Sequence, residues 1–345
     1  MNLQRFEELH MERFIADKPA DPRDSSKLMV VLRETGALEH RVFRDIEQYF
    51  RAGDVLVLND SKVFPAKLSG KKETGGKIQI LLMEETGPAL WTAIASGSKL
   101  NSKIIFEGGV TATAVENTGD GKWLLRFDTN DVLGFALAHG IMPLPPYIEK
   151  LRRRLGGETS LPLDRTRYQT VYAQNSGSIA APTAGFHFTP ELLQTLTNKG
   201  VAIAHVTLHV GWGTFRPMRA NSVEEHVMLP EYAVMPEKTA DIINSARGEG
   251  RRVISVGTTS TRTIESFTDA HGVTAPGAKW ADLYIYPPYK FRGIDALVTN
   301  FHVPDSTPIC LAGSFAGEDL LYKAYGEAAA SGYRFYSYGD SMLII

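Results

Sequence analysis

The texture of the chain changes near Pro146, and this change constrains the fold more than any other feature of the sequence. Between residues 54 and 128, short apolar runs alternate with glycine-rich turns and show no helical period. Many short strands separated by such turns predict a small antiparallel β-barrel. After Pro146, strands and helices alternate at the spacing of an α/β domain. With 345 residues, the chain is long enough for both units.

The N-terminal segment also has mixed character, so we expect a discontinuous α/β domain with the barrel inserted into it. The predicted α/β domain covers residues 1–63 and 148–345, and the predicted β-barrel domain covers residues 64–147. The proline-rich residues 142–147 predict a stiff extended link out of the barrel. Asp131 is the expected N-cap of a short helix. Strands are expected at 201–210, 252–256 and 295–299, and helices at 131–139, 236–247, 261–271 and 317–330.

Composition excludes several classes of protein. The longest apolar runs, such as residues 78–83, have strand length and are too short to cross a bilayer. Residues 1–14 lack the apolar core of a secretory signal, so we expect a cytoplasmic protein. The single cysteine, Cys310, excludes an intrachain disulfide and a thiolate-only metal cage. The net charge of −2 means that any nucleic-acid surface must be a local patch.

The common nucleotide-binding motifs are missing. The sequence has no GxxxxGK[ST], and no GxGxxG follows the strand predicted at residues 55–58. Residues 59–62, with the sequence NDSK, stand where such a loop would be. There is also no HExxH and no Cys/His cluster, so we expect no metal.

Four segments of the second half share an unusual chemistry. In each of them, at residues 180–188, 206–215, 256–265 and 298–307, an apolar stretch runs into Gly, Thr, Ser, Asn or His. Open α/β sheets bind ligands at the carboxyl ends of their strands, where backbone N–H groups and hydroxyls can contact a ligand. Any one segment would also fit a turn or a helix cap, but four together favour a ligand site. The candidate substrate-binding residues in these segments and in the turn at 336–340 are Thr183, Gly185, Gly211, Gly213, Thr214, Thr258, Thr259, Arg262, Asn300 and Asp340.

Three histidines, His187, His209 and His302, lie in these segments. A single histidine is more often structural than catalytic, but three in convergent loops favour at least one that exchanges protons. Basic residues form two runs, one from Lys67 to Lys77 and one after the proline-rich link. The second run consists of Lys150, Arg152, Arg153 and Arg154. Such a run can hold RNA phosphates, although spacing alone favours a solvated face.

Eight motifs in order over almost the whole chain resemble the S-adenosylmethionine:tRNA ribosyltransferase-isomerase family of queuosine biosynthesis. They are GDVLVLNDSKVFPAKLSG (53–70), MPLPPYI (142–148), DRTRYQTVYA (164–173), AAPTAGFHF (180–188), VTLHVGWGTFRP (206–217), VGTTSTRTIES (256–266), DALVTNFHVPDST (295–307) and YRFYSYGDSMLI (333–344). The resemblance implies an α/β domain with an inserted β-barrel, in agreement with the pattern above.

The resemblance also implies a reaction. The aminomethyl group of 7-aminomethyl-7-deazaguanine, at the wobble position of a tRNA, attacks the ribosyl moiety of S-adenosylmethionine. Adenine and methionine leave, and epoxyqueuosine-tRNA forms. S-adenosylmethionine is then a consumed substrate, and no cofactor is expected. General bases with a pKa near neutrality suit these steps, so we expect His187 and His209 to be catalytic, followed by His302, with Asp305 as an orienting carboxylate. We expect Lys150, Arg152, Arg153 and Arg154 to bind tRNA, and the protein to be a monomer.

The sequence departs from the family pattern at Trp212, at Leu229-Pro230 and at residues 308–310. These departures leave open a diverged paralogue that uses S-adenosylmethionine on another substrate. A second alternative is a non-catalytic tRNA-binding module of the same fold. Release of adenine separates an enzyme from a pure binder, and its dependence on tRNA separates the two kinds of enzyme.

Overall fold

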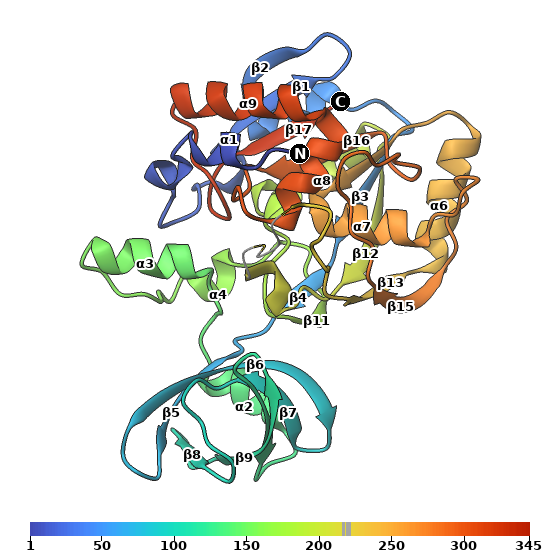
Figure 1. The fold of residues 1–345 in the computed structure, drawn as a ribbon. Coiled ribbons are helices and arrows are strands. Elements are labelled where there is room, and N and C mark those ends of the chain that lie inside the picture. Colours follow the sequence, from blue (N-terminus) through green and yellow to red (C-terminus); the bar gives the residue numbers. More distant parts are fainter. Residues whose placement is uncertain (216–217, 219–221) are drawn as a thin grey trace.

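The computed structural model describes residues 1–215, 218 and 222–345. Within this part, the α/β domain is built on a nine-stranded sheet with the order β15-β13-β12-β3-β14-β16-β17-β1-β2 (Figure 1). Strands β12, β3, β14 and β16 are parallel neighbours, and the strands at both edges add antiparallel pairs. The strands are β1 (Lys27–Leu32), β2 (Ala37–Val42), β3 (Val55–Asn59), β12 (Ala202–Leu208), β13 (Glu231–Met235), β14 (Val253–Val256), β15 (Gly277–Ala281), β16 (Ala296–Asn300) and β17 (Ser341–Ile344).

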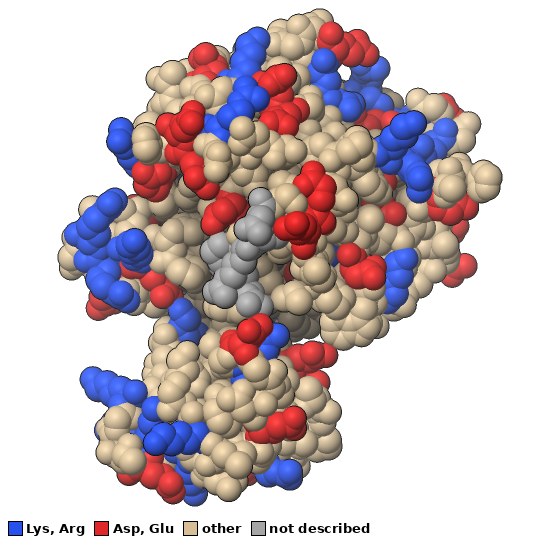
Figure 2. Space-filling model, viewed as in Figure 1, with Lys and Arg blue, Asp and Glu red and all other residues tan. Residues whose placement is uncertain are grey.

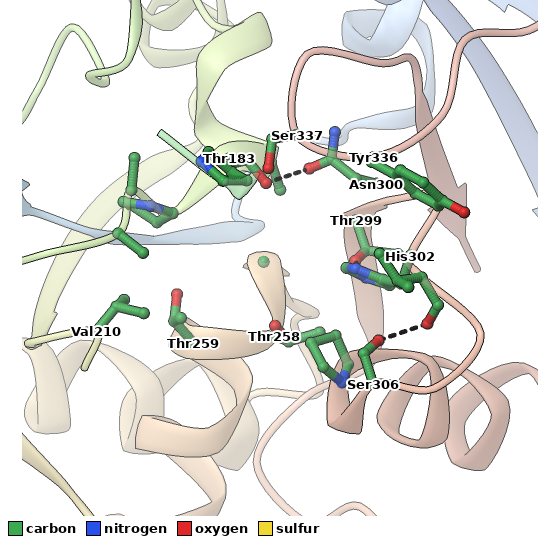
Figure 3. Close-up of a pocket in the computed structure, with 18 of the residues that line it drawn as sticks. Thr183, Val210, Thr258, Thr259, Thr299, Asn300, His302, Ser306, Tyr336 and Ser337 are labelled. Atoms are coloured by element: carbon green, nitrogen blue, oxygen red, sulfur yellow. Dashed lines mark hydrogen bonds between the residues drawn. The ribbon is translucent and has the colours of Figure 1, made fainter. Parts of the chain in front are cut away.

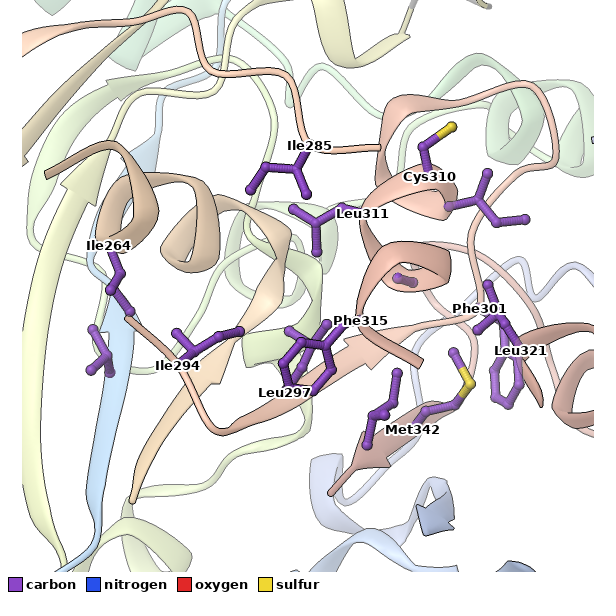
Figure 4. Packing of buried hydrophobic residues seen from close by; sticks show 14 of the residues in the cluster. Ile264, Ile285, Ile294, Leu297, Phe301, Cys310, Leu311, Phe315, Leu321 and Met342 are labelled. Carbon is purple, nitrogen blue, oxygen red and sulfur yellow. The ribbon is translucent and has the colours of Figure 1, made fainter. Parts of the chain in front are cut away.

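The middle of the sheet is buried on both faces. In β3, Val55 and Val57 belong to one hydrophobic cluster, and Leu56 and Leu58 belong to a second cluster on the opposite face. This alternation explains why β3 reads as a continuous apolar run. Figure 4 shows the first cluster, in which Leu297 of β16 lies among side chains such as Ile264 and Phe315 from the covering helices. The helices of the domain are α1 (Gln4–Glu7), α3 (Pro146–Arg154), α4 (Asp164–Arg167), α5 (Pro190–Asn198), α6 (Glu237–Gly248), α7 (Gly257–Phe267), α8 (Thr307–Ala316) and α9 (Glu318–Ala330).

The inserted domain is a closed antiparallel barrel, as predicted. Its strand order is β10-β7-β6-β5-β8-β9, and it has a separate core that contains Trp91 and Trp123. The strands are β5 (Lys67–Lys72), β6 (Lys77–Gly87), β7 (Leu90–Ile94), β8 (Lys103–Phe106), β9 (Thr111–Gly119) and β10 (Lys122–Phe127). Helix α2 (Val132–His139) follows, and Asp131 caps it by accepting a hydrogen bond from the N–H of Gly134 at 2.8 Å, which confirms the predicted cap.

Two chain segments connect the domains. The chain leaves the α/β domain after the short strand β4 (Ser61–Val63), which pairs with β11 (Asn175–Ser178). It returns beside its own exit, because Lys67 and Ile141 exchange two backbone hydrogen bonds of 3.2 and 3.0 Å. The return differs from the predicted extended link in one respect. Helix α3 already begins at Pro146, and the hydroxyl of Tyr147 lies 2.6 Å from the hydroxyl of Ser337 in the α/β domain.

Other differences lie in the second half. Helix α7 covers Gly257–Phe267, not residues 261–271 as predicted. Helices α5 and α8 and strands β13, β15 and β17 were not predicted. The chain turns directly from β14 into α7 at Gly257, which has a φ of +85°. This conformation favours glycine, and it allows a strand and a helix to follow one another without a loop.

Candidate active site

A cavity of about 420 Å³ lies at the carboxyl ends of β14 and β16, between the N-termini of α7 and α8 (Figure 3). We call it the sheet-edge cavity. Three of the four predicted polar segments contribute several residues to it, and the fourth contributes Val210. Its lining includes Thr183, Val210, Gly257, Thr258, Thr259, Thr299, Asn300, His302, Asp305, Ser306, Tyr336 and Ser337. The predicted convergence of these segments at one edge of the sheet is therefore confirmed.

The hydroxyl side chains at the start of α7 fall into two groups, one bonded inside the fold and one facing the cavity. Ser260 and Thr261 donate to the carbonyl oxygens of Val256 and Gly257, at 2.8 and 3.1 Å, and lie inside the fold. Thr258 and Thr259 face the sheet-edge cavity instead. The Oγ1 of Thr259 is shielded from solvent and has no hydrogen-bond partner in the described part of the chain. A ligand in the cavity can therefore bind this hydroxyl together with the free N–H groups of the first helical turn.

His187 lies beneath the cavity and not in its wall. It is 4% exposed, and its pKa is lowered to about 3 by burial and by the nearby charges of Arg334 and Arg23. Its Nε2 lies 3.2 Å from the side-chain nitrogen of Asn300, whose oxygen accepts a hydrogen bond from Thr183 at 2.9 Å. His187 thus positions two residues that do line the cavity. The expectation that His187 exchanges protons with a substrate is not supported by this placement.

His302 lines the sheet-edge cavity directly. Its Nε2 lies 2.6 Å from Oγ1 of Thr299, and its backbone N–H donates to the hydroxyl oxygen of Tyr325 at 2.6 Å. Burial lowers the pKa of His302 to about 3, so the ring is neutral at physiological pH. A ring with so low a pKa binds protons weakly and is better suited to hydrogen bonding than to general-base catalysis.

A second cavity, of about 720 Å³, lies where the barrel meets the α/β domain. We call it the junction cavity. His209 lines it together with Gly211 and Gly213, and Val210 lines both cavities. Nδ1 of His209 lies 2.9 Å from Oγ of Ser61, in the NDSK segment after β3. A Cβ on Gly177 would lie 2.8 Å from this imidazole, so a glycine is needed there for the ring to fit. Burial lowers the pKa of His209, while Asp60 acts in the opposite direction.

Three predicted substrate-binding residues do not line the sheet-edge cavity and have contacts within the fold. Arg262 is buried and ion-paired with Glu231, whose other oxygen accepts from the N–H of Gly211 at 2.9 Å. Asp340 accepts hydrogen bonds from the backbone N–H groups of Lys27 and Arg334, at 2.9 and 2.8 Å. Asp340 is 2% exposed and its carboxylate has protein partners, so the structure does not support substrate contact there. Arg262 also lines a small pocket beside Thr258 and Thr259, so its contact with substrate stays a prediction.

The third of these residues is Gly185. A Cβ on Gly185 would lie 2.0 Å from the hydroxyl of Tyr172, so this glycine is required for packing. The side chain of Thr214, also predicted to bind substrate, lies outside the described residues.

The predicted basic run on α3 contains one buried residue and three residues that are accessible. Arg152 is 2% exposed and forms two hydrogen bonds with Asp164, at 2.7 and 2.9 Å, so its predicted role in tRNA binding is wrong. Lys150 lines the sheet-edge cavity, while Arg153 and Arg154 are exposed. Figure 2 shows Lys and Arg gathered over α3 and over the neighbouring side of the barrel.

Sequence patterns alone did not identify several residues of the site. Ser26 holds Nδ1 of His187 at 2.7 Å, and Ser61 holds His209. Tyr336 and Ser337 reach the sheet-edge cavity from the turn before β17. Ser61 carried a signal, since its segment follows a parallel strand at the binding edge of the sheet, and Tyr336 and Ser337 belong to the turn at 336–340 that the sequence also indicated. Among the described residues, no group of three or more His, Cys, Asp or Glu side chains is placed to hold a metal ion. No helix of the described part is long and apolar enough to cross a membrane.

The fold and the two neighbouring cavities, whose linings share Val210, define a class of protein: an α/β domain with an inserted barrel and candidate binding cavities at the carboxyl edge of its sheet and at the domain junction. The chain belongs to the queuosine biosynthesis protein family, whose model matches residues 5–344. It is 47% identical to S-adenosylmethionine:tRNA ribosyltransferase-isomerase of Desulfitobacterium hafniense, over the full length of both chains. It is 43% identical, again over both full lengths, to the protein of the same name from Staphylococcus saprophyticus.

A solved structure supports the same assignment. The crystal structure of S-adenosylmethionine tRNA ribosyltransferase from Thermotoga maritima matches with a TM-score of 0.55 and 34% sequence identity. The match covers 96% of this chain and 97% of that chain, so it includes both domains.

Proposed function

We propose that this protein transfers and isomerises the ribosyl moiety of S-adenosylmethionine onto 7-aminomethyl-7-deazaguanine in tRNA. The products are epoxyqueuosine-tRNA, adenine and methionine. Full-length relatives at 43–47% identity carry the name of this activity. The structural observation that carries the proposal is that Val210 lines both cavities. Two substrates bound on either side of Val210 would have their reacting groups next to each other.

S-adenosylmethionine is assigned to the sheet-edge cavity. Its volume of about 420 Å³ suits a ligand of this size. The methionine part carries a carboxylate, and the N-terminus of α7 offers unpaired N–H groups and a favourable dipole for an anion. The hydroxyls of Thr258 and Thr259 lie at the same place. Lys150 contributes a positive charge to the cavity wall and adds to this attraction.

The reaction requires proton transfers that the histidines can serve. The attacking amine must lose protons, a C–H beside the sulfonium must be removed, and the departing adenine must gain a proton or a hydrogen bond. We assign general-base catalysis to His209, which lies beside Val210 and is kept neutral by its lowered pKa. His302 and Asp305 line the cavity and are assigned to hydrogen bonding with the substrate or the leaving group.

The remaining features of the proposal are the expectations stated from the sequence and from its resemblance to the family. The tRNA base is placed at the wobble position, the protein is placed in the cytoplasm as a monomer, and no metal or additional cofactor is required. The test is a reaction of the purified, metal-free protein with S-adenosylmethionine and precursor-bearing tRNA, analysed by mass spectrometry. Adenine, methionine and an epoxyqueuosine nucleoside are expected. Formation of S-adenosylhomocysteine would refute the proposal, because that product means methyl transfer. Adenine release without tRNA would indicate a different acceptor, and no release would indicate a binding module.

A further inference from the structure

The junction cavity opens beside a row of three aromatic rings, His209, Tyr232 and Trp280. Tyr232 of β13 and Trp280 of β15 are direct cross-strand partners, with ring centroids 5.6 Å apart. The ring of Tyr232 is also nearly parallel to that of His209, with 6.3 Å between centroids. All three residues line the cavity. Trp280 is 54% exposed and Tyr232 38% exposed, so both offer aromatic surface to a ligand.

The junction cavity also contains hydrogen-bonding groups without protein partners among the described residues. Trp91 is 5% exposed, and its indole N–H has no hydrogen-bond partner in the described residues. It can only donate, so a buried acceptor from a ligand would satisfy it. Glu84 and Glu85 of β6 are exposed and line the same cavity. Neither carboxylate forms an ion pair or a side-chain hydrogen bond within the described chain, and both can only accept.

We propose that the junction cavity holds a guanine-type base of the RNA substrate, with Trp280 as its stacking surface. This inference rests on the proposed function and adds the place where the RNA base binds. Guanine and 7-deazaguanine carry adjacent N–H donors at N1 and N2 beside the O6 acceptor. Carboxylates complement the donors, and the free indole N–H complements an acceptor. Unstacked RNA bases are commonly held by aromatic side chains and read along this edge.

The charges favour a base over the RNA backbone or a protein partner. Lys122 of β10 also lines the cavity, but Glu84 and Glu85 outnumber it and disfavour a phosphate there. Other Lys and Arg side chains gather over α3 and the neighbouring side of the barrel, where phosphates can reach them (Figure 2). The core of a protein–protein interface is typically depleted of charged residues, which makes two exposed carboxylates in this cavity an unusual feature for such a partner. The shared wall at Val210 places the base next to the sheet-edge cavity.

The test measures the affinity of the full-length protein for two synthetic anticodon stem–loop RNAs. One carries guanine at the wobble position, and the other carries an abasic site there. Trp280→Ala is expected to weaken binding of the first RNA by about 5- to 150-fold, the range of a lost stacking contact. It should leave binding of the abasic RNA unchanged. Trp280→Phe keeps an aromatic face and should retain most of the affinity. The salt dependence should stay the same in both variants, because no charge is removed.

A second pair of RNAs tests the carboxylates. Wild-type protein should prefer guanine over hypoxanthine, which lacks the N2 amine, and the double variant Glu84→Gln/Glu85→Gln should lose this preference. If Trp280→Ala weakens binding of the guanine RNA and the abasic RNA equally, or weakens neither, the base-binding assignment is overturned. A change in oligomeric state of Trp280→Ala in sedimentation, without a change in RNA affinity, would identify a protein interface instead.

The outcomes also separate this inference from the proposed function. Adenine release by the wild type, together with normal RNA binding by Trp280→Ala, would refute only the base site. Base-dependent binding without adenine release by the wild type would keep the base site and refute the proposed reaction.

Discussion

The side-chain nitrogen of Asn300 lies 3.2 Å from Nε2 of His187, and this contact fixes the protonation of the imidazole. The same nitrogen faces the carbonyl oxygen of Asp340 at 3.4 Å, and an amide nitrogen only donates. Nε2 therefore accepts, and the proton of the neutral ring is on Nδ1, which donates to Ser26 at 2.7 Å. The ring carries no free nitrogen toward the cavity, so its contribution to the site is to orient Asn300.

This burial predicts a pH effect on stability. The pKa of His187 is about 3 in the folded protein and 6.5 in a solvated chain, so the unfolded state binds more protons between these values. The resulting stabilisation is present above pH 6.5 and is lost as the pH falls. Relative to His187→Gln, the wild type should lose about 2 kcal/mol of unfolding free energy between pH 6.5 and 5, measured by urea denaturation. Parallel pH profiles of the two proteins would contradict the assignment.

Thr183 should affect binding of S-adenosylmethionine without affecting the RNA. Its hydroxyl donates to Asn300 at 2.9 Å, and both residues line the sheet-edge cavity. Thr183→Val removes a hydrogen bond of about 1 kcal/mol and frees the amide to rotate, so affinity for S-adenosylmethionine should fall about 5-fold. Calorimetric titration measures this change. Thr195→Val on the exposed face of α5 is the matched control, and an equal effect there would show that the loss is not local.

The two kinds of arginine on α3 should separate stability from tRNA binding. Arg153→Ala with Arg154→Ala removes two exposed charges and should flatten the plot of log affinity against log salt by up to roughly one unit per lost phosphate contact. The stability of this double variant should equal that of the wild type. Arg152→Ala instead leaves Asp164 buried without its partner and should cost about 3–5 kcal/mol of stability. Wild-type salt dependence in the double variant would assign these arginines to a solvated face.

His209 is the proton-transfer residue of the proposal, so His209→Gln should lower single-turnover adenine release about 10²-fold or more. The ring is only half-buried, so the thermal unfolding temperature of the His209→Gln variant should differ little from that of the wild type. His226→Gln is a useful control, since His226 lies outside the linings of both cavities. Turnover of His209→Gln at the wild-type rate would leave the ring with a structural role.

The sequence predicted the fold well where one physical signal dominated. The apolar run of β3 and the N-cap Asp131 were both recognisable, because burial on two faces and capping need particular residues. The early start of α7 was not recognisable, because serine and threonine usually disfavour helix interiors. Here Ser260 and Thr263 donate to carbonyls one turn earlier, which satisfies their hydroxyls inside the helix.

The candidate site was harder to predict, because chemistry-bearing residues also serve the fold. Arg152 follows the buried Ile148 by one helical turn and shares its inward face, whereas Arg153 and Arg154 point to solvent. The sequence identifies the three arginines as a cluster, but only the partner at Asp164, contributed by another helix, decides which of them is buried. The same holds for Arg262 and its tertiary partner Glu231.

The paired crossing at Lys67 and Ile141 has a consequence for the order of folding. Strands β3 and β12 are neighbours in the sheet, yet the whole barrel lies between them in the chain. Closing a loop of that length costs about 4 kcal/mol of chain entropy. A barrel that forms first brings its own two ends together through the hydrogen bonds of Lys67 and Ile141. Closure of the barrel at this crossing shortens the effective separation of β3 and β12 by roughly half, which lowers the entropy cost of bringing the two strands together by about 0.6 kcal/mol.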